Sequence, residues 1–310
     1  MAYSIREAYG KHIAKLGKLN NNIIVLEGDL ADSTQSEHFQ KAFPGRYFQI
    51  GIAEQNMVGI AAGLALEGKI PIVNSFAAFI AMRACEQVRT DVAYPNLNVK
   101  FVVSHAGLSA GSAGPTHHTV EDIAIMRAIP NMTVLVPGDM KEAEQVIDAA
   151  LEHNGPVYVR NSAIDVDNIY GDSHHFILGK ATQLREGNDA TIITTGTLMH
   201  EGVKAVDVLK KDHGINVRVL QMASIKPLDV DVIKTAADET GFILTIEEHN
   251  ILGGLGGAVS EVVAEYGSGK VKRLGIDNHF CSITGSPEYL MKKEGLTVDV
   301  IVSNVTNFFE

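Results

Sequence analysis

One glutamate stands out in this sequence because of the residues that follow it. Glu54 lies in the segment Gly51-Ile-Ala-Glu-Gln-Asn-Met57, at the start of a predicted helix whose next residues are apolar or small. Burying a carboxylate beside such a helix is costly unless another group satisfies it. We therefore expect Glu54 to be buried and to bind a ligand, and we expect that ligand to be a cofactor.

Two phenylalanines offer an aromatic wall. Phe76 and Phe79 are three residues apart, so on the first turn of a helix they project from one side. Such a pair could line a site for a planar heterocycle. Phenylalanine pairs belong more often to a packed core, and the spacing alone leaves both interpretations open.

Two polar residues follow predicted strands, and a third lies further along the same loop. Asp29 comes after the strand predicted at 23–26, and His105 comes directly after the strand predicted at 99–104. A glycine-rich stretch then separates His105 from His117, and glycines let the backbone approach a ligand closely. Open α/β sheets bind their ligands at the carboxyl ends of the strands, which favours a binding role for this set.

The whole chain alternates short β-branched runs with longer segments of helical period. This pattern is typical of parallel sheets covered by helices, so the predicted fold class is α/β with two doubly wound domains in tandem. Residues 1–165 form the first predicted domain, the turn-rich residues 166–189 a linker, and residues 190–310 the second domain. A capping box, Ser4-x-x-Glu7, opens the first helix. Further strands are predicted at 70–74, 133–136, 191–195, 216–220, 242–246 and 271–274, and helices at 55–66, 78–93, 120–128, 140–151, 200–211, 229–238, 256–266 and 286–294.

Composition excludes several classes of protein. A chain of 310 residues with 45% hydrophobic content can bury a sizeable core. Its net charge of -11 and the lack of any long basic run argue against a nucleic-acid surface. It has no apolar run of membrane-spanning length and no signal-peptide pattern, so no membrane is expected. Cys85 and Cys281 are isolated, which favours a reducing compartment, and we expect the cytoplasm.

Several blocks of sequence, in order, carry a resemblance to the transketolase family. The chain resembles the thiamine-pyrimidine-binding half of these enzymes and their C-terminal domain, over nearly all of its length. Whole transketolases are about twice as long and carry a preceding domain with a Gly-Asp-Gly…Asn motif, and no Gly-Asp-Gly occurs here. The resemblance therefore implies the C-terminal subunit of a split transketolase. Its blocks are Ser4 to Gly10, Glu27 to Thr34, Gly51 to Met57, Ser75 to Phe79, Ser104-His105, Gly114-Pro-Thr-His117 and Ile225 to Asp229.

The resemblance implies thiamine diphosphate as cofactor, with Mg2+ whose ligands all lie on the partner subunit. Glu54 would bind a pyrimidine ring nitrogen and favour the imino tautomer that can accept a proton. Phe79 would stack on the pyrimidine, with Phe76 and Asp29 beside the cofactor.

The resemblance also implies a sugar site. His117 would contact the hydroxyls of the sugar donor, and His105 would contact its phosphate. Arg6, Ser33 and Arg160 would complete the grip on the far phosphate, because guanidinium groups suit phosphate oxygens. One segment departs from the family pattern: Ser112-Ala113 replaces the usual Glu-Asp before Gly-Pro-Thr-His. The usual pentose-phosphate acceptors therefore do not follow from the resemblance, whereas the thiamine chemistry does.

The implied activity is transfer of a two-carbon ketol unit from a ketose phosphate to an aldose. It would require an N-terminal, diphosphate-binding subunit, in a heterotetramer of two copies of each. Three alternatives stay open: the β subunit of a 2-oxo acid dehydrogenase, a deoxyxylulose-phosphate-synthase-like enzyme, and a non-catalytic binding protein that kept the fold. The expected phosphate-binding residues disfavour the first. Retention of Glu54, Phe79 and His117 together disfavours the last.

Overall fold

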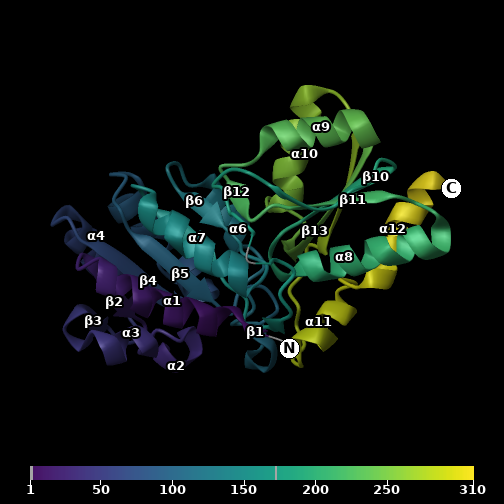
Figure 1. The fold of residues 1–310 in the computed structure, drawn as a ribbon. Coiled ribbons are helices and arrows are strands. Elements are labelled where there is room, and N and C mark those ends of the chain that lie inside the picture. The colour runs from purple at the N-terminus through teal and green to yellow at the C-terminus, as the bar shows by residue number, and fades with distance from the viewer. Residues whose placement is uncertain (1–2, 172) are drawn as a thin grey trace.

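The computed structural model describes residues 3–171 and 173–310, which form two α/β units lying side by side (Figure 1). Each unit is a twisted, mainly parallel sheet with helices on its faces. The predicted fold class, two doubly wound α/β domains in tandem, is confirmed. A short antiparallel pair, β1 (Tyr3–Ser4) with β8 (Asp165–Val166), ties the start of the chain to the end of the first domain.

The first sheet has seven strands in the order β12-β6-β7-β5-β4-β2-β3. All neighbours are parallel except β12, which runs antiparallel to β6. The predicted strands of this domain are all present, with small shifts of their ends. Their bounds are β2 (Ile23–Glu27), β3 (Tyr47–Gln49), β4 (Ile70–Phe76), β5 (Lys100–Ser104), β6 (Thr133–Leu135), β7 (Val157–Arg160) and β12 (Ser224–Lys226).

Helices cover both faces of this sheet. On one face α1 (Ile5–Leu19), α3 (Glu37–Ala42) and α7 (Met140–Glu152) bury residues such as Ile13 and Phe39. The Ser4 hydroxyl accepts from the Glu7 N–H at 3.3 Å, which confirms the predicted cap of α1. The other face carries α4 (Glu54–Leu66), η2 (Phe79–Arg83), α5 (Cys85–Gln87), η3 (Val88–Ala93) and α6 (Asp122–Ala128); the shorter elements are α2 (Ala31–Thr34), η1 (Pro44–Arg46) and η4 (Gly111–Ala113).

The second sheet has five strands in the order β14-β13-β10-β11-β9. Strand β9 (Thr182–Arg185) is antiparallel to β11 and lies inside the predicted linker 166–189. Its side chains are alternately half-buried and exposed, so this edge strand lacks the apolar run by which the other strands are predicted. The other elements are β10 (Ala190–Thr194), η5 (Gly196–Leu198), α8 (Met199–Val208), η6 (Leu209–His213), β11 (Val217–Gln221), α9 (Val230–Thr240), β13 (Phe242–Asn250), α10 (Leu255–Tyr266), β14 (Lys270–Ile276), α11 (Pro287–Lys293) and α12 (Val298–Phe309).

The two domains share one hydrophobic core. Strand β12 belongs to the second half of the chain but extends the first sheet, and Ile225 on it is buried. Met222 and Leu255 of the second domain lie in the same apolar cluster as Tyr158 of the first. Because apolar contacts of this kind hold domains in one orientation, the second domain is a fixed neighbour of the first.

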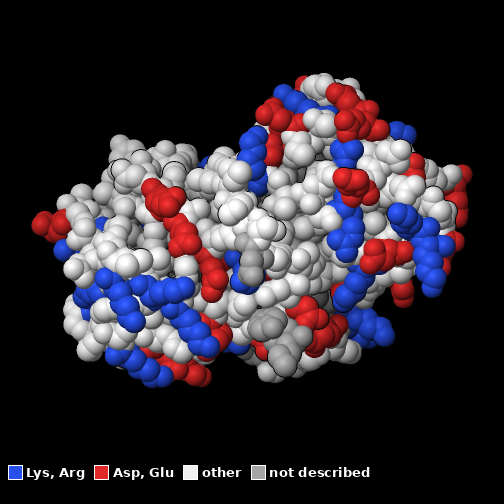
Figure 2. Space-filling model, viewed as in Figure 1, with Lys and Arg blue, Asp and Glu red and all other residues white. Residues whose placement is uncertain are grey.

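The surface carries both signs of charge. Figure 2 shows Lys and Arg interspersed with Asp and Glu over both domains on the face in view. Among residues 3–171 and 173–310, no helix has the length and apolar character needed to cross a membrane.

Candidate functional site

A cavity of about 420 Å³ lies at the carboxyl ends of β2 and β4. Ligands bind at this edge of open α/β sheets because the loops that follow the strands gather there. The cavity is lined by five of the predicted site residues and by five further residues. Its lining is Gly28, Asp29, Leu30, Ile52, Glu54, Phe76, Phe79, Arg83, Thr116 and His117.

Glu54 is the first residue of α4 and is 1% exposed. The positive end of the helix dipole favours a carboxylate at this position. Its Oε2 accepts from Arg83 Nη1 at 2.8 Å, whereas its buried Oε1 has no hydrogen-bond partner among the described residues. An unsatisfied buried carboxylate oxygen costs free energy, so Oε1 points to a donor supplied by a bound group.

Four rings gather beside Glu54. Phe76 and Phe79 are stacked, with centroids 5.9 Å apart and an angle of 18° between their planes. His117 meets Phe79 edge-on at 5.3 Å, and the His105 ring lies 4.0 Å from that of Phe76. The structure thus brings together two histidines and two phenylalanines that are up to 41 residues apart in the sequence. This arrangement can receive a planar aromatic group.

The helix predicted at 78–93 is irregular where it meets this group. Residues Phe79–Arg83 form one π-helical turn, and a second follows at Val88–Ala93. Short π-helical turns often lie at functional sites. Here the turn places the Arg83 guanidinium 4.3 Å above the Phe79 ring while Arg83 also binds Glu54. Arg83 was missed by sequence reasoning, although its position four residues after Phe79 was a usable signal.

His105 is held neutral. Burial lowers its pKa to about 4, and the nearby positive charge of Arg6 and the ring of His117 act in the same direction. Its Nδ1 lies 3.0 Å from the Ser104 hydroxyl. A neutral imidazole can donate one hydrogen bond and accept another, so His105 can contact an anionic or hydroxyl group without carrying charge at neutral pH.

Arg6 lies near His105, because its charge acts on the imidazole. Its Nη1 donates to the Ser33 carbonyl oxygen at 2.8 Å, which joins these two predicted residues. Burial lowers the pKa of Arg6, while Asp165 and Asp32 favour its charged form. Asp29, exposed at the rim of the cavity, has a left-handed backbone with φ of 66°, and its N–H donates to Gln49 Oε1.

Arg160 does not join this group. Its guanidinium is buried between the domains, where Nε donates to Asp122 Oδ2 at 2.8 Å. Its Nη2 donates to the carbonyl oxygens of Thr119 and Glu248. Because a guanidinium so engaged within the chain is poorly placed to grip a phosphate, we revise the expected role of Arg160 from phosphate ligand to link between the domains. The amino-acid sequence around Arg160 gave no sign of Asp122 or Glu248 as partners.

Within the described residues, no group of three or more His, Cys, Asp or Glu side chains is arranged to hold a metal ion. The site is therefore a buried carboxylate, an aromatic wall and a set of polar groups at one sheet edge, on a two-domain α/β frame.

This chain belongs to the transketolase family. The family model for the transketolase pyrimidine binding domain matches residues 1–167, and that for the transketolase C-terminal domain matches residues 179–301. A Methanocaldococcus jannaschii protein named as a transketolase C-terminal section is 45% identical over 97% of this chain and 95% of its own length.

Two further relatives support the same assignment. A 6-deoxy-6-sulfo-D-fructose transketolase subunit of a Clostridium species is 39% identical over 96% of this chain and 92% of its own. A solved structure described as a split gene transketolase, in an inactive β4 tetramer, has a TM-score of 0.90 and 41% identity, covering 98% of this chain and 97% of that one. The predicted resemblance to split transketolases is confirmed.

Proposed function

We propose that this chain is one subunit of a split transketolase and transfers a two-carbon ketol unit from a ketose to an aldose with thiamine diphosphate. The observation that carries this proposal is the Glu54 carboxylate, buried at the cavity with Oε1 unpartnered. A protonated or donor ring nitrogen is the kind of group that would satisfy that oxygen.

The residues present fit the pyrimidine end of this cofactor. Glu54 would hold a ring nitrogen through Oε1, and Phe79 would stack on the ring. Bound thiamine diphosphate supplies a carbon nucleophile that no amino-acid side chain provides. Glu54 would favour the imino form of the ring, which can accept a proton, while His117 and the neutral His105 orient the sugar.

We propose that the diphosphate and Mg2+ are held by a separate N-terminal subunit. A relative of this size is described as an inactive tetramer of β chains, which supports a need for a second kind of chain. Two apolar side chains are exposed at the two ends of α4: Ile52, which lines the cavity, is 73% exposed, and Leu66 is 71% exposed. Exposed apolar surface of this kind favours a protein interface, and we propose a heterotetramer of two copies of each subunit.

The proposed donor is a ketose with an anionic far end. Arg6 lies close enough to His105 for its charge to act on the imidazole, and both side chains can contact such a group. One relative is named for a sulfo-sugar and others for apulose 4-phosphate, so a sulfonate or a phosphate is the chemistry to test. We keep the cytoplasm as the proposed compartment, since both cysteines are free thiols.

The test is reconstitution. The chain alone, the N-terminal subunit alone and their mixture are assayed for ketol transfer with thiamine diphosphate and Mg2+. We expect activity in the mixture only. Reaction of the mixture with pyruvate and a lipoyl acceptor would instead assign it to the 2-oxo acid dehydrogenases. Absence of turnover with a partner that forms a stable complex would contradict the proposed function and favour a binding protein.

A further inference from the structure

The two histidines of the site flank a loop with a narrow neck. Gly107 and Thr119 pair across it: the Gly107 N–H donates to the Thr119 carbonyl at 2.9 Å, and the Thr119 N–H donates to the Gly107 carbonyl at 3.0 Å. His105 lies two residues before this neck, and His117 lies two residues before its end. The position of the neck therefore sets where both imidazoles lie beside Phe76 and Phe79.

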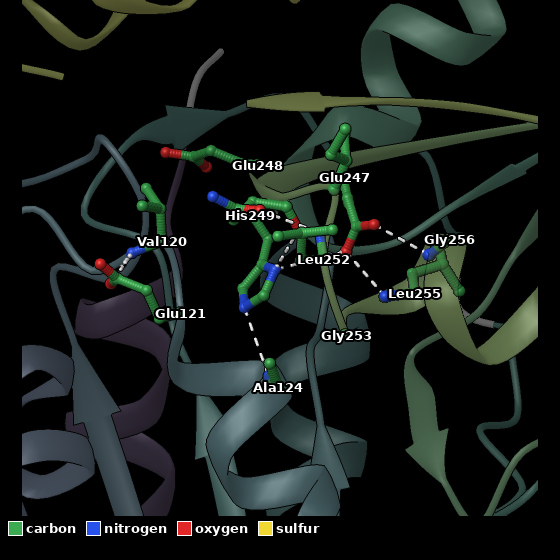
Figure 3. Close-up of polar contacts among 12 residues, drawn as sticks. Val120, Glu121, Ala124, Glu247, Glu248, His249, Leu252, Gly253, Leu255 and Gly256 are labelled. Atoms are coloured by element: carbon green, nitrogen blue, oxygen red, sulfur yellow. Dashed lines mark hydrogen bonds and ion pairs between the residues drawn. The ribbon is translucent and has the colours of Figure 1, made fainter. Parts of the chain in front are cut away.

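The second domain holds both sides of this neck. Glu248, on β13, accepts from the Leu108 N–H through Oε1 at 2.6 Å. On the other side, the Asn250 N–H donates to the Val120 carbonyl at 2.7 Å. Figure 3 shows this end of β13 against the segment that carries Val120 and Ala124. Two residues of one strand, Glu248 and Asn250, thus contact the chain on the two sides of the neck.

Arg160 adds a further contact between the neck and β13. Its Nη2 donates to the Thr119 carbonyl at 3.2 Å and to the Glu248 carbonyl at 3.0 Å, so one guanidinium nitrogen joins the neck to β13. Arg160 and Glu248 are each 5% exposed. Buried, hydrogen-bonded charged groups have few alternative positions, which makes this contact stiff.

The packing leaves no free space at the neck. A Cβ placed on Gly107 would lie 2.5 Å from the Glu248 carboxyl group. The φ of Gly107 is +64°, a conformation that side chains other than glycine rarely adopt. Glu248 therefore fits against the bare backbone of the loop, and a shift of the carboxylate would shift the loop.

We propose that Glu248 is a positioning residue for the sugar site: from the second domain, it fixes the neck of the loop and thereby the places of His105 and His117. The inference rests on the proposed function for the sugar, whereas the fixing of the loop does not depend on it. Glu248 does not line the cavity and acts through the backbone N–H groups of Leu108 and Ser109 and through its own carbonyl oxygen.

Glu247 provides a matched control on the same strand. It is fully buried, and its oxygens accept from the Leu255 and Gly256 N–H groups at 2.7 and 2.8 Å, all within the second domain. Figure 3 shows the two carboxylates directed to opposite sides of β13. Loss of Glu247 therefore removes a buried carboxylate and two hydrogen bonds but no contact with the loop.

The experiment has two readouts. Hydrogen exchange of the full chain is followed in peptides covering 107–119, and the reconstituted complex is assayed for the KM of the ketose donor, kcat and the Kd of thiamine diphosphate. Glu248→Ala should speed exchange of the loop and raise the donor KM about 10-fold or more, since small displacements of orienting groups weaken productive binding. The Kd of thiamine diphosphate should stay within about threefold, because Glu54 and Phe79 lie on other elements.

Two further variants separate positioning from folding. Glu248→Gln keeps an oxygen that can accept from the Leu108 N–H and should restore slow exchange and a near-normal KM. If Glu248→Ala does not fold, Glu248→Asp replaces it in the test. Aspartate keeps the charge but is shorter by one methylene group, so this variant should also show faster loop exchange and a raised donor KM. Glu247→Ala, the control matched to Glu248→Ala, should alter neither loop exchange nor the donor KM.

Unchanged loop exchange in folded Glu248→Ala or Glu248→Asp would overturn the inference. Equal rises of the donor KM in Glu247→Ala and Glu248→Ala would overturn it as well, since they would reflect general damage to β13. Failure of the wild-type complex to transfer ketol units would instead refute the proposed function, and loop exchange would still decide whether Glu248 fixes the loop.

Discussion

Arg83 Nη1 lies 2.8 Å from Glu54 Oε2, and Glu54 Oε1 has no partner among the described residues. One oxygen of the buried carboxylate is thus fixed by a cation from η2, and the other is left for a ligand. The same guanidinium lies 4.3 Å above the ring of Phe79. Arg83 therefore links the carboxylate to the aromatic wall.

Glu54→Gln should lower kcat/KM by at least about 100-fold, the usual size of a proton-transfer contribution, since an amide cannot drive the tautomer shift of the pyrimidine in the same way. The measurement is steady-state ketol transfer by the reconstituted complex. Glu67→Gln serves as the control: Glu67 is exposed just beyond the other end of α4, and its substitution should leave kcat/KM unchanged. Near-normal rates for Glu54→Gln would remove Glu54 from its assigned role.

Arg83→Met should weaken binding of thiamine diphosphate about 10-fold, because it leaves Glu54 Oε2 buried without its charged donor. Arg83→Lys, which keeps the charge but not the planar fork, should fall between Met and wild type. Calorimetric titration of the complex in the presence of Mg2+ measures the Kd. Arg89→Met changes an exposed arginine of the neighbouring η3 and should leave the Kd unaltered; equal losses in both variants would contradict a specific role for Arg83.

His117→Ala should raise the KM for the ketose donor by about 3- to 10-fold, the loss expected for one neutral hydrogen bond. The Kd of thiamine diphosphate should change little, since His117 meets the Phe79 ring only by its edge. Initial rates at varied donor concentration, beside a cofactor titration, give both values. A weaker cofactor Kd with an unchanged donor KM would assign His117 to the cofactor instead.

Arg160→Ala should destabilise the fold by about 3 to 5 kcal/mol, because it leaves the buried Asp122 carboxylate without its positively charged partner. Any rise in KM should be the same for phosphorylated and unphosphorylated donors. Urea unfolding measures the first effect and kinetics with paired donors the second. Arg185→Ala, at a solvent-exposed ion pair with Asp207, should cost under about 1 kcal/mol. A KM effect confined to phosphorylated donors would return Arg160 to the phosphate site.

Glu142 should make stability depend on pH. It is fully buried between the domains, accepting from the Gly138 N–H and from Gln221 Nε2, and burial raises its pKa to about 7. A carboxyl whose pKa is raised on folding stabilises fully below its unfolded pKa of about 4.5, and that contribution is lost as pH rises through 7.

Wild type should therefore lose stability relative to Glu142→Gln between pH 5.5 and pH 8.5, by about 1 to 3 kcal/mol, since one unit of pKa corresponds to about 1.4 kcal/mol. Urea unfolding of both proteins at the two pH values tests this. Glu152→Gln, exposed on the same helix α7, should show no such difference from wild type. If the difference in the free energy of unfolding between wild type and Glu142→Gln does not change with pH, Glu142 is not the group that makes stability depend on pH.

The amino-acid sequence by itself determined the class of fold, the family and most of the elements. Alternating apolar periods are local properties, so the strands that contain Ile23 and Phe242 could be predicted, as could the cap at Ser4. Glu54, Phe79 and His117 were found because each follows an element end within a recognisable block. These three residues line one cavity in the folded chain.

Tertiary structure alone decided which distant residues meet. Strand β12 joins the sheet of the other domain, and Arg160 binds Asp122 and Glu248, which lie 38 and 88 residues away along the chain. The period of a segment shows which of its faces is apolar, but it holds no information on which remote element covers that face or supplies a counter-charge. For that physical reason the pairing of Arg83 with Glu54, and the hold of Glu248 on the loop, became visible only in the folded chain.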